Sequence, residues 1–124
     1  MASSSADLHE NADVLGPETI DRHRAVVSIM EELEAVDWYD QRVQASSDEE
    51  LKAILAHNRD EEKEHAAMVL EWLRRRDTAL DRQLRAYLFK DKPVLEIEAD
   101  ADARDSSKDA ADGSLRIGSL RRKE

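Results

Sequence analysis

The stretch that decides the fold is LKAILAHNRDEEKEHAAMVLEW, residues 51–72. In a helix, positions spaced alternately by four and three residues share one face. The residues at that spacing are Leu51, Leu55, Asn58, Glu62, His65, Val69 and Trp72. Most of this face is apolar, but Glu62 and His65 lie one turn apart in its middle. The stretch therefore predicts a helix that places a carboxylate and an imidazole together on its core-facing side.

The segment before this stretch repeats the pattern. Gly16 and Pro17, followed by an acidic residue, are typical of a helix start. We expect that helix to run to about Gln44. The residues that would face the core are Ala25, Ile29, Glu32, Val36, Tyr39 and Val43. Glu32 is the charged member of this mostly apolar face, so both helices carry a carboxylate on their packing side.

A short turn at residues 45–48 separates the two helices. Ser47 and Glu50 have the spacing of a capping box, which predicts a second helix running to about Arg75. A turn this short is typical of an antiparallel helical hairpin. At about 1.5 Å per residue, measured from the turn, Glu32 lies ~21 Å along the first helix and Glu62 ~24 Å along the second. The two carboxylates and the imidazole of the second helix should thus meet at one level.

The remaining chain divides by composition. Asp77 or Thr78 could cap a third, shorter helix that ends near Phe89, before Pro93. We expect a flexible start at residues 1–15, a helical domain at 16–91, a flexible acidic linker at 92–112 and a separate tail at 113–124. The linker consists mostly of Glu, Asp, Ala and Ser, a composition with little apolar surface to bury. The tail carries three apolar residues, Leu115, Ile117 and Leu120.

Composition narrows the classes of function. The 124 residues include 19 Lys and Arg against 29 Asp and Glu, a formal charge of -10. This balance argues against nucleic acid or an anionic membrane as a partner. No Cys is present, which excludes disulfides and thiolate metal sites. With no leader-like or membrane-spanning stretch, we expect a soluble cytoplasmic protein. Two Trp, two Tyr and one Phe make a poor monomeric core, so association is also expected.

The three polar residues of the hairpin predict a metal site. Buried, unpaired carboxylates are unfavourable, and a cation compensates them. A helix-borne Glu together with Glu-x-x-His is half of the ligand set of ferritin-like carboxylate sites. The sequence has one such set, so a two-fold dimer would complete both the site and a four-helix bundle. Carboxylate and imidazole ligands suit iron or manganese. His65 could instead be an ordinary core histidine or a partner of Glu61.

Two blocks of sequence closely resemble encapsulated ferritins. They are RHRAVVSIMEELEAVDWYD at residues 22–40 and ILAHNRDEEKEHAAM at residues 54–68, the latter followed by EWLR at residues 71–74. The tail GSLRIGSL, residues 113–120, resembles the targeting peptide that loads cargo into encapsulin shells. The first resemblance covers roughly residues 15–90.

The resemblance implies a structure and an activity. Family members are helical hairpins that pair and close into a ring of five dimers. Their ferroxidase centre, a di-iron site, uses the residues that match Glu32, Glu62 and His65 from each of two chains. The residue that matches Tyr39 lies near this centre. The residues that match Glu31, Glu34 and Trp38 lie near a secondary metal site on the path to it. Such proteins oxidise Fe(II) with dioxygen, and the surrounding encapsulin stores the mineral.

These arguments combine into one hypothesis with two rivals. The protein is expected to be a ferroxidase in the lumen of an encapsulin compartment, with its tail docked on the shell. One rival is a non-catalytic, metal-stabilised helical cargo or scaffold protein. The other is a peroxide-dependent iron oxidase of the mini-ferritin type. The oxidant and the consequence of metal removal would separate the three.

Overall fold

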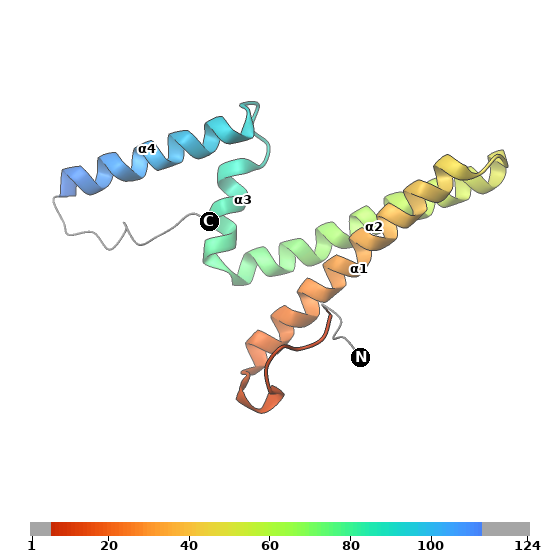
Figure 1. The fold of residues 1–124 in the computed structure, drawn as a ribbon, viewed down its shortest axis with the longest axis horizontal. Helices are drawn as coiled ribbons and strands as arrows, with labels where there is room; N and C mark the ends of the chain where they lie inside the picture. Colours follow the sequence, from red (N-terminus) through yellow and green to blue (C-terminus); the bar gives the residue numbers. More distant parts are fainter. Residues whose placement is uncertain (1–5, 113–124) are drawn as a thin grey trace. The chain divides into compact units, whose positions relative to one another are not determined.

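The computed structural model describes residues 6–112, with side chains described to residue 106, and every regular element in that range is helical. The elements are η1 (Ala12–Val14), α1 (Pro17–Ala45), α2 (Glu49–Arg76), α3 (Thr78–Tyr87) and α4 (Val94–Asp112) (Figure 1). The predicted all-α fold is confirmed. Within the described range, the helices all lack the length or the apolarity needed to cross a membrane.

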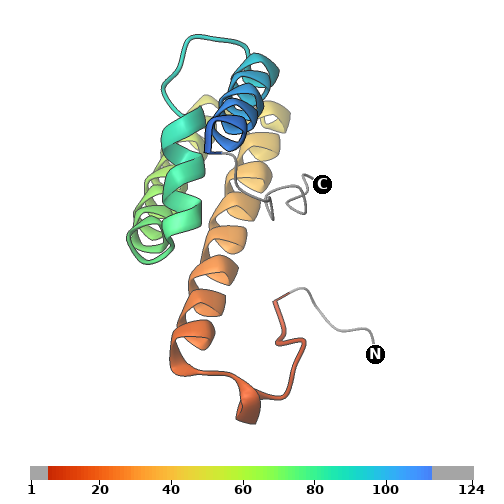
Figure 2. The ribbon, with the colours of Figure 1, turned by 90° about the vertical axis from the view of Figure 1, so that its left-hand side faces the viewer.

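Helices α1 and α2 form an antiparallel hairpin about the turn at residues 46–48, seen from two sides in Figures 1 and 2. The last residues of α1 and α2 are each one position beyond the predicted Gln44 and Arg75. All six predicted core-facing residues of α1 are half-buried, and so are six of the seven on α2. The exception is Leu51, near the start of α2, which is 46% exposed. The hydrophobic spacing thus identifies most of the packing faces, but it leaves out Ala66 and Leu73, the two residues of α2 that are buried.

The cap of α2 differs from the predicted one. Asp48, not Ser47, occupies the N-cap position, and its side-chain Oδ1 accepts a hydrogen bond of 2.8 Å from the backbone N–H of Leu51. The hydroxyl of Ser46 accepts from the N–H of Asp48, at 3.2 Å. Serine and aspartate both cap helices well, so the local sequence alone did not separate these adjacent positions. The hydrogen bond from the N–H of Leu51 to the Asp48 side chain identifies Asp48 as the cap.

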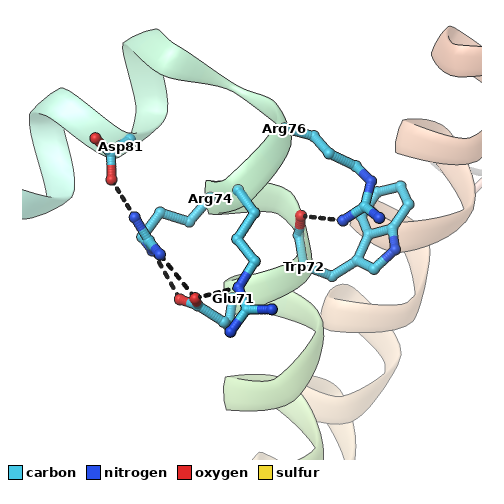
Figure 3. A network of polar contacts seen from close by, with 6 residues as sticks. Glu71, Trp72, Arg74, Arg76 and Asp81 are labelled. Atoms are coloured by element: carbon cyan, nitrogen blue, oxygen red, sulfur yellow. Dashed lines mark hydrogen bonds and ion pairs between the residues drawn. The ribbon is translucent and has the colours of Figure 1, made fainter.

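At the end of α2, an ion-pair network links this helix to the start of α3 (Figure 3). Arg74 donates to both carboxylate oxygens of Glu71, at 2.7 and 2.8 Å, and to Asp81 in α3. The guanidinium of Arg76 lies 4.0 Å from the centroid of the Trp72 ring. The basic residues at this end also complement the negative end of the helix dipole.

Helix α3 begins as predicted and ends slightly earlier. Asp77 is its cap, because its Oδ1 accepts a hydrogen bond of 2.9 Å from the N–H of Leu80. The helix ends at Tyr87, whereas the sequence suggested an end near Phe89. Phe89 has φ of 61°, in the left-handed region, where the helix cannot continue. Its side chain is fully exposed.

Residues 92–112 were predicted to be a flexible linker, but the structure has helix α4 over most of this segment. Its first turn begins directly after Pro93, whose carbonyl accepts from the N–H groups of Glu96 and Ile97 at 3.0 and 3.1 Å. Lys92 pairs with Asp100 over the following turns. A segment with too little apolar surface for a core can still form a helix, because Ala and Glu favour a helix locally.

The chain falls into two compact units, Met1–Asp81 and Arg82–Glu124. The sequence placed the end of the helical domain at residue 91 instead. In the first unit, the hydrophobic residues that are buried among those described are Ala66 and Leu73, both on α2; in the second unit, Ile97 is buried. Large apolar side chains such as Leu33 and Ile54 are about half exposed, at 54% and 52%. One hairpin therefore covers only part of its own apolar surface.

Candidate metal centre

The hairpin brings Glu32 of α1 to Glu62 and His65 of α2 (these three residues are called the metal cluster below). One possible ligand atom from each residue lies within 4.8 Å of the others. His65 Nδ1 is 3.5 Å from Oε2 of Glu32 and 3.4 Å from Oε2 of Glu62. Glu62 and His65 share a face because they are one helical turn apart. The convergence predicted from the levels of these residues in the hairpin is therefore present in the single chain.

The cluster is partly withdrawn from water. The side chains of Glu32 and Glu62 are 26% and 24% exposed, and that of His65 is 44% exposed. Oε2 of Glu32 is buried and has no hydrogen-bond partner. The imidazole Nδ1 of His65 lies 3.5 Å away, near enough to attract this oxygen electrostatically but too far for a good hydrogen bond. Buried polar atoms normally have a partner, so this oxygen marks a position that a cation would satisfy.

The electrostatics of the cluster follow from this crowding. The pKa of Glu32 is raised, first by its interaction with the Glu62 side chain and then by burial, while His65 acts in the opposite direction. Burial lowers the pKa of His65, but the charges of Glu32 and Glu62 outweigh it, and the pKa is raised from its ordinary value. Both shifts reflect excess negative charge in a small volume. A divalent cation would remove their cause by occupying the space between these groups.

The donor set fits a first-row divalent metal. Two carboxylates and one imidazole are ligands typical of iron and manganese sites. The buried, unpartnered oxygen of Glu32 provides an independent sign of the same fit. The three donors of one chain match half of the ligand set found in carboxylate two-metal sites of helix bundles. The chain could therefore bind a cation alone, and two chains could bind a pair.

The other residues predicted for the site lie elsewhere on α1. Glu31, Glu34 and Trp38 are exposed, Trp38 by 49%, and do not belong to the metal cluster. Tyr39 is half-buried, and the guanidinium of Arg42 lies 5.5 Å from the centroid of its ring. A role of the exposed residues in metal uptake stays a prediction. The apolar tail residues predicted to dock on a shell, Leu115, Ile117 and Leu120, lie outside the described residues.

The structure argues against one alternative reading of the histidine. Glu61, proposed as a partner of His65, lies 3.5 Å from Nε2 of His57 instead. A contact near the cluster was also missed: Arg59 of α2 donates to Asp40 of α1 at 2.9 Å. Matching charges by level would not have found this pair, because Arg59 lies several residues farther from the turn than Asp40 does.

A helical hairpin that carries a Glu and a Glu-x-x-His set on its packing face defines a ferritin-like half-bundle. A family model described as EncFtn-like matches residues 7–91. The chain belongs to the EncFtn-like family.

Similar proteins support this assignment. The encapsulated ferritin-like protein of Rhodospirillum rubrum is 62% identical over 129 residues, which cover 98% of this chain and 92% of that protein. A ferritin-like protein of Thermotoga maritima is 56% identical over 90 residues, covering 73% of this chain and 79% of that protein. A crystal structure of a protein from Nitrosomonas europaea superposes with a TM-score of 0.69 and 63% identity. It covers 70% of this chain and 96% of its own.

Proposed function

We propose that the protein is a ferroxidase that oxidises Fe(II) to Fe(III) with dioxygen at a di-iron site shared between two chains. The observation that carries this proposal is the metal cluster, with three potential donor atoms within 4.8 Å and one buried oxygen that lacks a partner. Iron is the substrate, and each ferrous ion bound there would give up one electron to the oxidant. Membership of the EncFtn-like family agrees with this reading.

The residues of the cluster would divide the work of binding. Glu32 and Glu62 would hold the cations through carboxylate oxygens and balance their charge. His65 would bind through a ring nitrogen, after releasing the proton that its acidic neighbours favour. Two chains would contribute four carboxylates, matching the charge of two ferrous ions. The exposed acids Glu31 and Glu34, with Trp38, would lie along the route by which cations reach the site.

The second half of the site requires a second chain. The half-exposed apolar residues of the hairpin provide surface for such a partner, and pairing two hairpins would build a four-helix bundle. Assembly into a ring of five dimers, and delivery of ferric iron to the lumen of an encapsulin shell, are part of the same proposal. The relative from Rhodospirillum rubrum is named as encapsulated, which supports the shell as partner. The tail at residues 113–124 would provide the attachment.

The direct test is dioxygen uptake after Fe(II) is added to the purified full chain, with Glu62→Ala and Glu61→Ala compared. Glu61 is adjacent to Glu62 and is the matched control, since its side chain is 54% exposed and pairs with His57. Rapid uptake by the native protein and by Glu61→Ala, lost in Glu62→Ala, is the expected result. Slow uptake that is equal in all three would contradict the ferroxidase proposal.

Two further measurements separate the proposed ferroxidase from its alternatives. A non-catalytic helical cargo or scaffold protein, stabilised by metal at the same cluster, would consume no dioxygen. It would nevertheless dissociate or unfold when a chelator is added, a change that sedimentation and circular dichroism detect. A peroxide-dependent oxidase would oxidise Fe(II) faster with hydrogen peroxide than with dioxygen.

A further inference from the structure

Asp40 and Arg59 form an ion pair that joins the two helices of the hairpin. Nη1 of Arg59 donates to Oδ1 of Asp40 at 2.9 Å, although the two residues are 19 positions apart in the sequence. The Arg59 side chain is only 22% exposed, and that of Asp40 is 65% exposed. Pairs such as Arg24 with Asp21 lie within a single helix and cannot fix one helix against another.

The neighbours of Arg59 hold its guanidinium in place. Its Nε donates to Oδ1 of Asp60 at 3.1 Å, and Lys63 lies 3.2 Å from that same oxygen. Asp60 thus holds one edge of the guanidinium while the other edge reaches across to Asp40. A planar group with donors on two edges can make both contacts at once, which a lysine ammonium could not do in this geometry.

The pair lies close to the metal cluster along the hairpin. Arg59 precedes Glu62 by about one helical turn, and Asp40 follows Glu32 by about two, both toward the turn of the hairpin. Side chains of a helix lean toward its N-terminus, and the N-terminus of α2 is at the turn. The long side chain of Arg59 therefore covers the difference in level and meets Asp40. The contact fits one alignment of α1 against α2.

We infer that Arg59 and Asp40 are positioning residues, which fix the alignment of the two helices at which Glu32 faces Glu62 and His65. The inference rests on the proposed metal site and assigns to it residues that touch no ligand atom. Each helix supplies part of the cluster, so a slip of one helix against the other separates the donors. Metal sites need donors placed within about 0.5 Å. Apolar packing is non-directional, so the apolar contacts between the helices do not by themselves prevent such a slip.

The test is Co(II) binding by the full chain, followed through the visible absorption of the bound ion. The variants are Arg59→Gln, Asp40→Asn and the double variant, with Arg24→Gln as the matched control. Arg24 loses the same charge by the same substitution but pairs only within α1. Asp40 is mostly exposed, so its replacement by Asn leaves the helix intact, which far-ultraviolet circular dichroism verifies.

Each single variant is expected to bind Co(II) roughly two- to fivefold more weakly, the range of a partly exposed ion pair. The double variant should be no weaker than either single one, because both substitutions remove the same contact. The absorption bands of bound Co(II) should also shift in all three, since the donors are less well placed. Arg24→Gln should match the native protein in affinity and spectrum.

Two results would overturn the inference while leaving the metal site in place. One is native affinity and spectrum in Arg59→Gln, and the other is losses in the two single variants that simply add in the double variant. Failure of the metal site has a different signature: Co(II) binding by the native protein that Glu62→Ala does not weaken. That outcome would overturn the proposed function and the positioning role together.

Discussion

Replacing Glu32 by Gln removes one of two carboxylates that face each other in the metal cluster and keeps the shape of the side chain. Oε2 of Glu32 is buried without a hydrogen-bond partner, so the native residue is unfavourable in the absence of a cation. An amide carries no charge to repel Glu62. We therefore expect Glu32→Gln to stabilise the metal-free protein and to weaken metal binding.

The size of the expected gain in stability follows from the distance between the two carboxylates. The ligand atoms of Glu32 and Glu62 are no more than 4.8 Å apart. Two unit charges at that separation repel by ~3.5 kcal/mol at an effective dielectric constant of about 20. About a quarter of each carboxylate side chain is exposed, and His65 offsets part of the repulsion, so about 1 kcal/mol is expected to remain. A second chain that brought two more carboxylates would increase this value.

The assay is thermal unfolding at pH 8, followed by circular dichroism with a chelator and again with Co(II) in excess. A gain of about 1 kcal/mol raises the midpoint by ~4–8 °C for a domain of this size. With Co(II) at about 100 times its dissociation constant, binding should raise the free energy of unfolding of the native protein by ~2.7 kcal/mol. The variant should gain much less. The order of stability should therefore reverse between the two conditions. Glu64→Gln, an exposed position on α2, is the control and should show no reversal.

The reasoning is refuted if Glu32→Gln melts at or below the native midpoint in the chelator. Repulsion within the cluster would then be too small to matter. If Co(II) raised the unfolding midpoint of both proteins equally, Glu32 would not hold the ion.

Three further predictions concern the fold. Leu73→Ala should lower the free energy of unfolding by about 2–5 kcal/mol, because Leu73 is only 6% exposed, whereas Met68→Ala at 58% exposure should change it far less; urea titrations compare the two. Asp48→Ala should destabilise the hairpin by ~0.5–2 kcal/mol through loss of the α2 cap, and Ser47→Ala, measured in the same way, should have little effect. The pKa of Glu71 is lowered from 4.5 to about 2, first by Arg74 and also by Arg75. Its folded value is below its unfolded value, so its contribution to stability is present above about pH 4.5 and is lost as the pH falls toward 2. In an acid titration of helicity, Glu71→Gln should flatten the decline in that window; an unchanged decline would contradict the assignment.

The hairpin and its cluster were predictable because they depend on spacing. A step of four and three residues places Glu32 on the packing face of α1, and the length of the turn sets the level at which Glu62 meets it. No other information is needed to bring these residues together. The half-buried state of nearly all predicted packing positions follows from the same periodicity.

The structure differs from the sequence-based predictions where two local conformations have nearly equal energy. Asp48 and Ser47 can both cap a helix, and only the hydrogen bond from Leu51 shows which one does. Residues 94–112 have too little apolar surface for a core of their own, yet helix formation needs only backbone hydrogen bonds and suitable side chains. The contact between Asp40 and Arg59 was missed for another reason. It depends on how far a long side chain leans along its helix, which sequence spacing does not state.

Few residues of the hairpin are buried, so its stability would depend on the protein concentration if two chains pair. Within the hairpin, each helix packs against one neighbour, and large apolar side chains such as Leu33 and Ile54 are about half exposed. A second chain that covered them, as proposed above, would add its binding free energy to the free energy of folding, and this addition would grow with protein concentration. Crowding many copies into a small volume would therefore hold each hairpin together more firmly, with no change in its sequence.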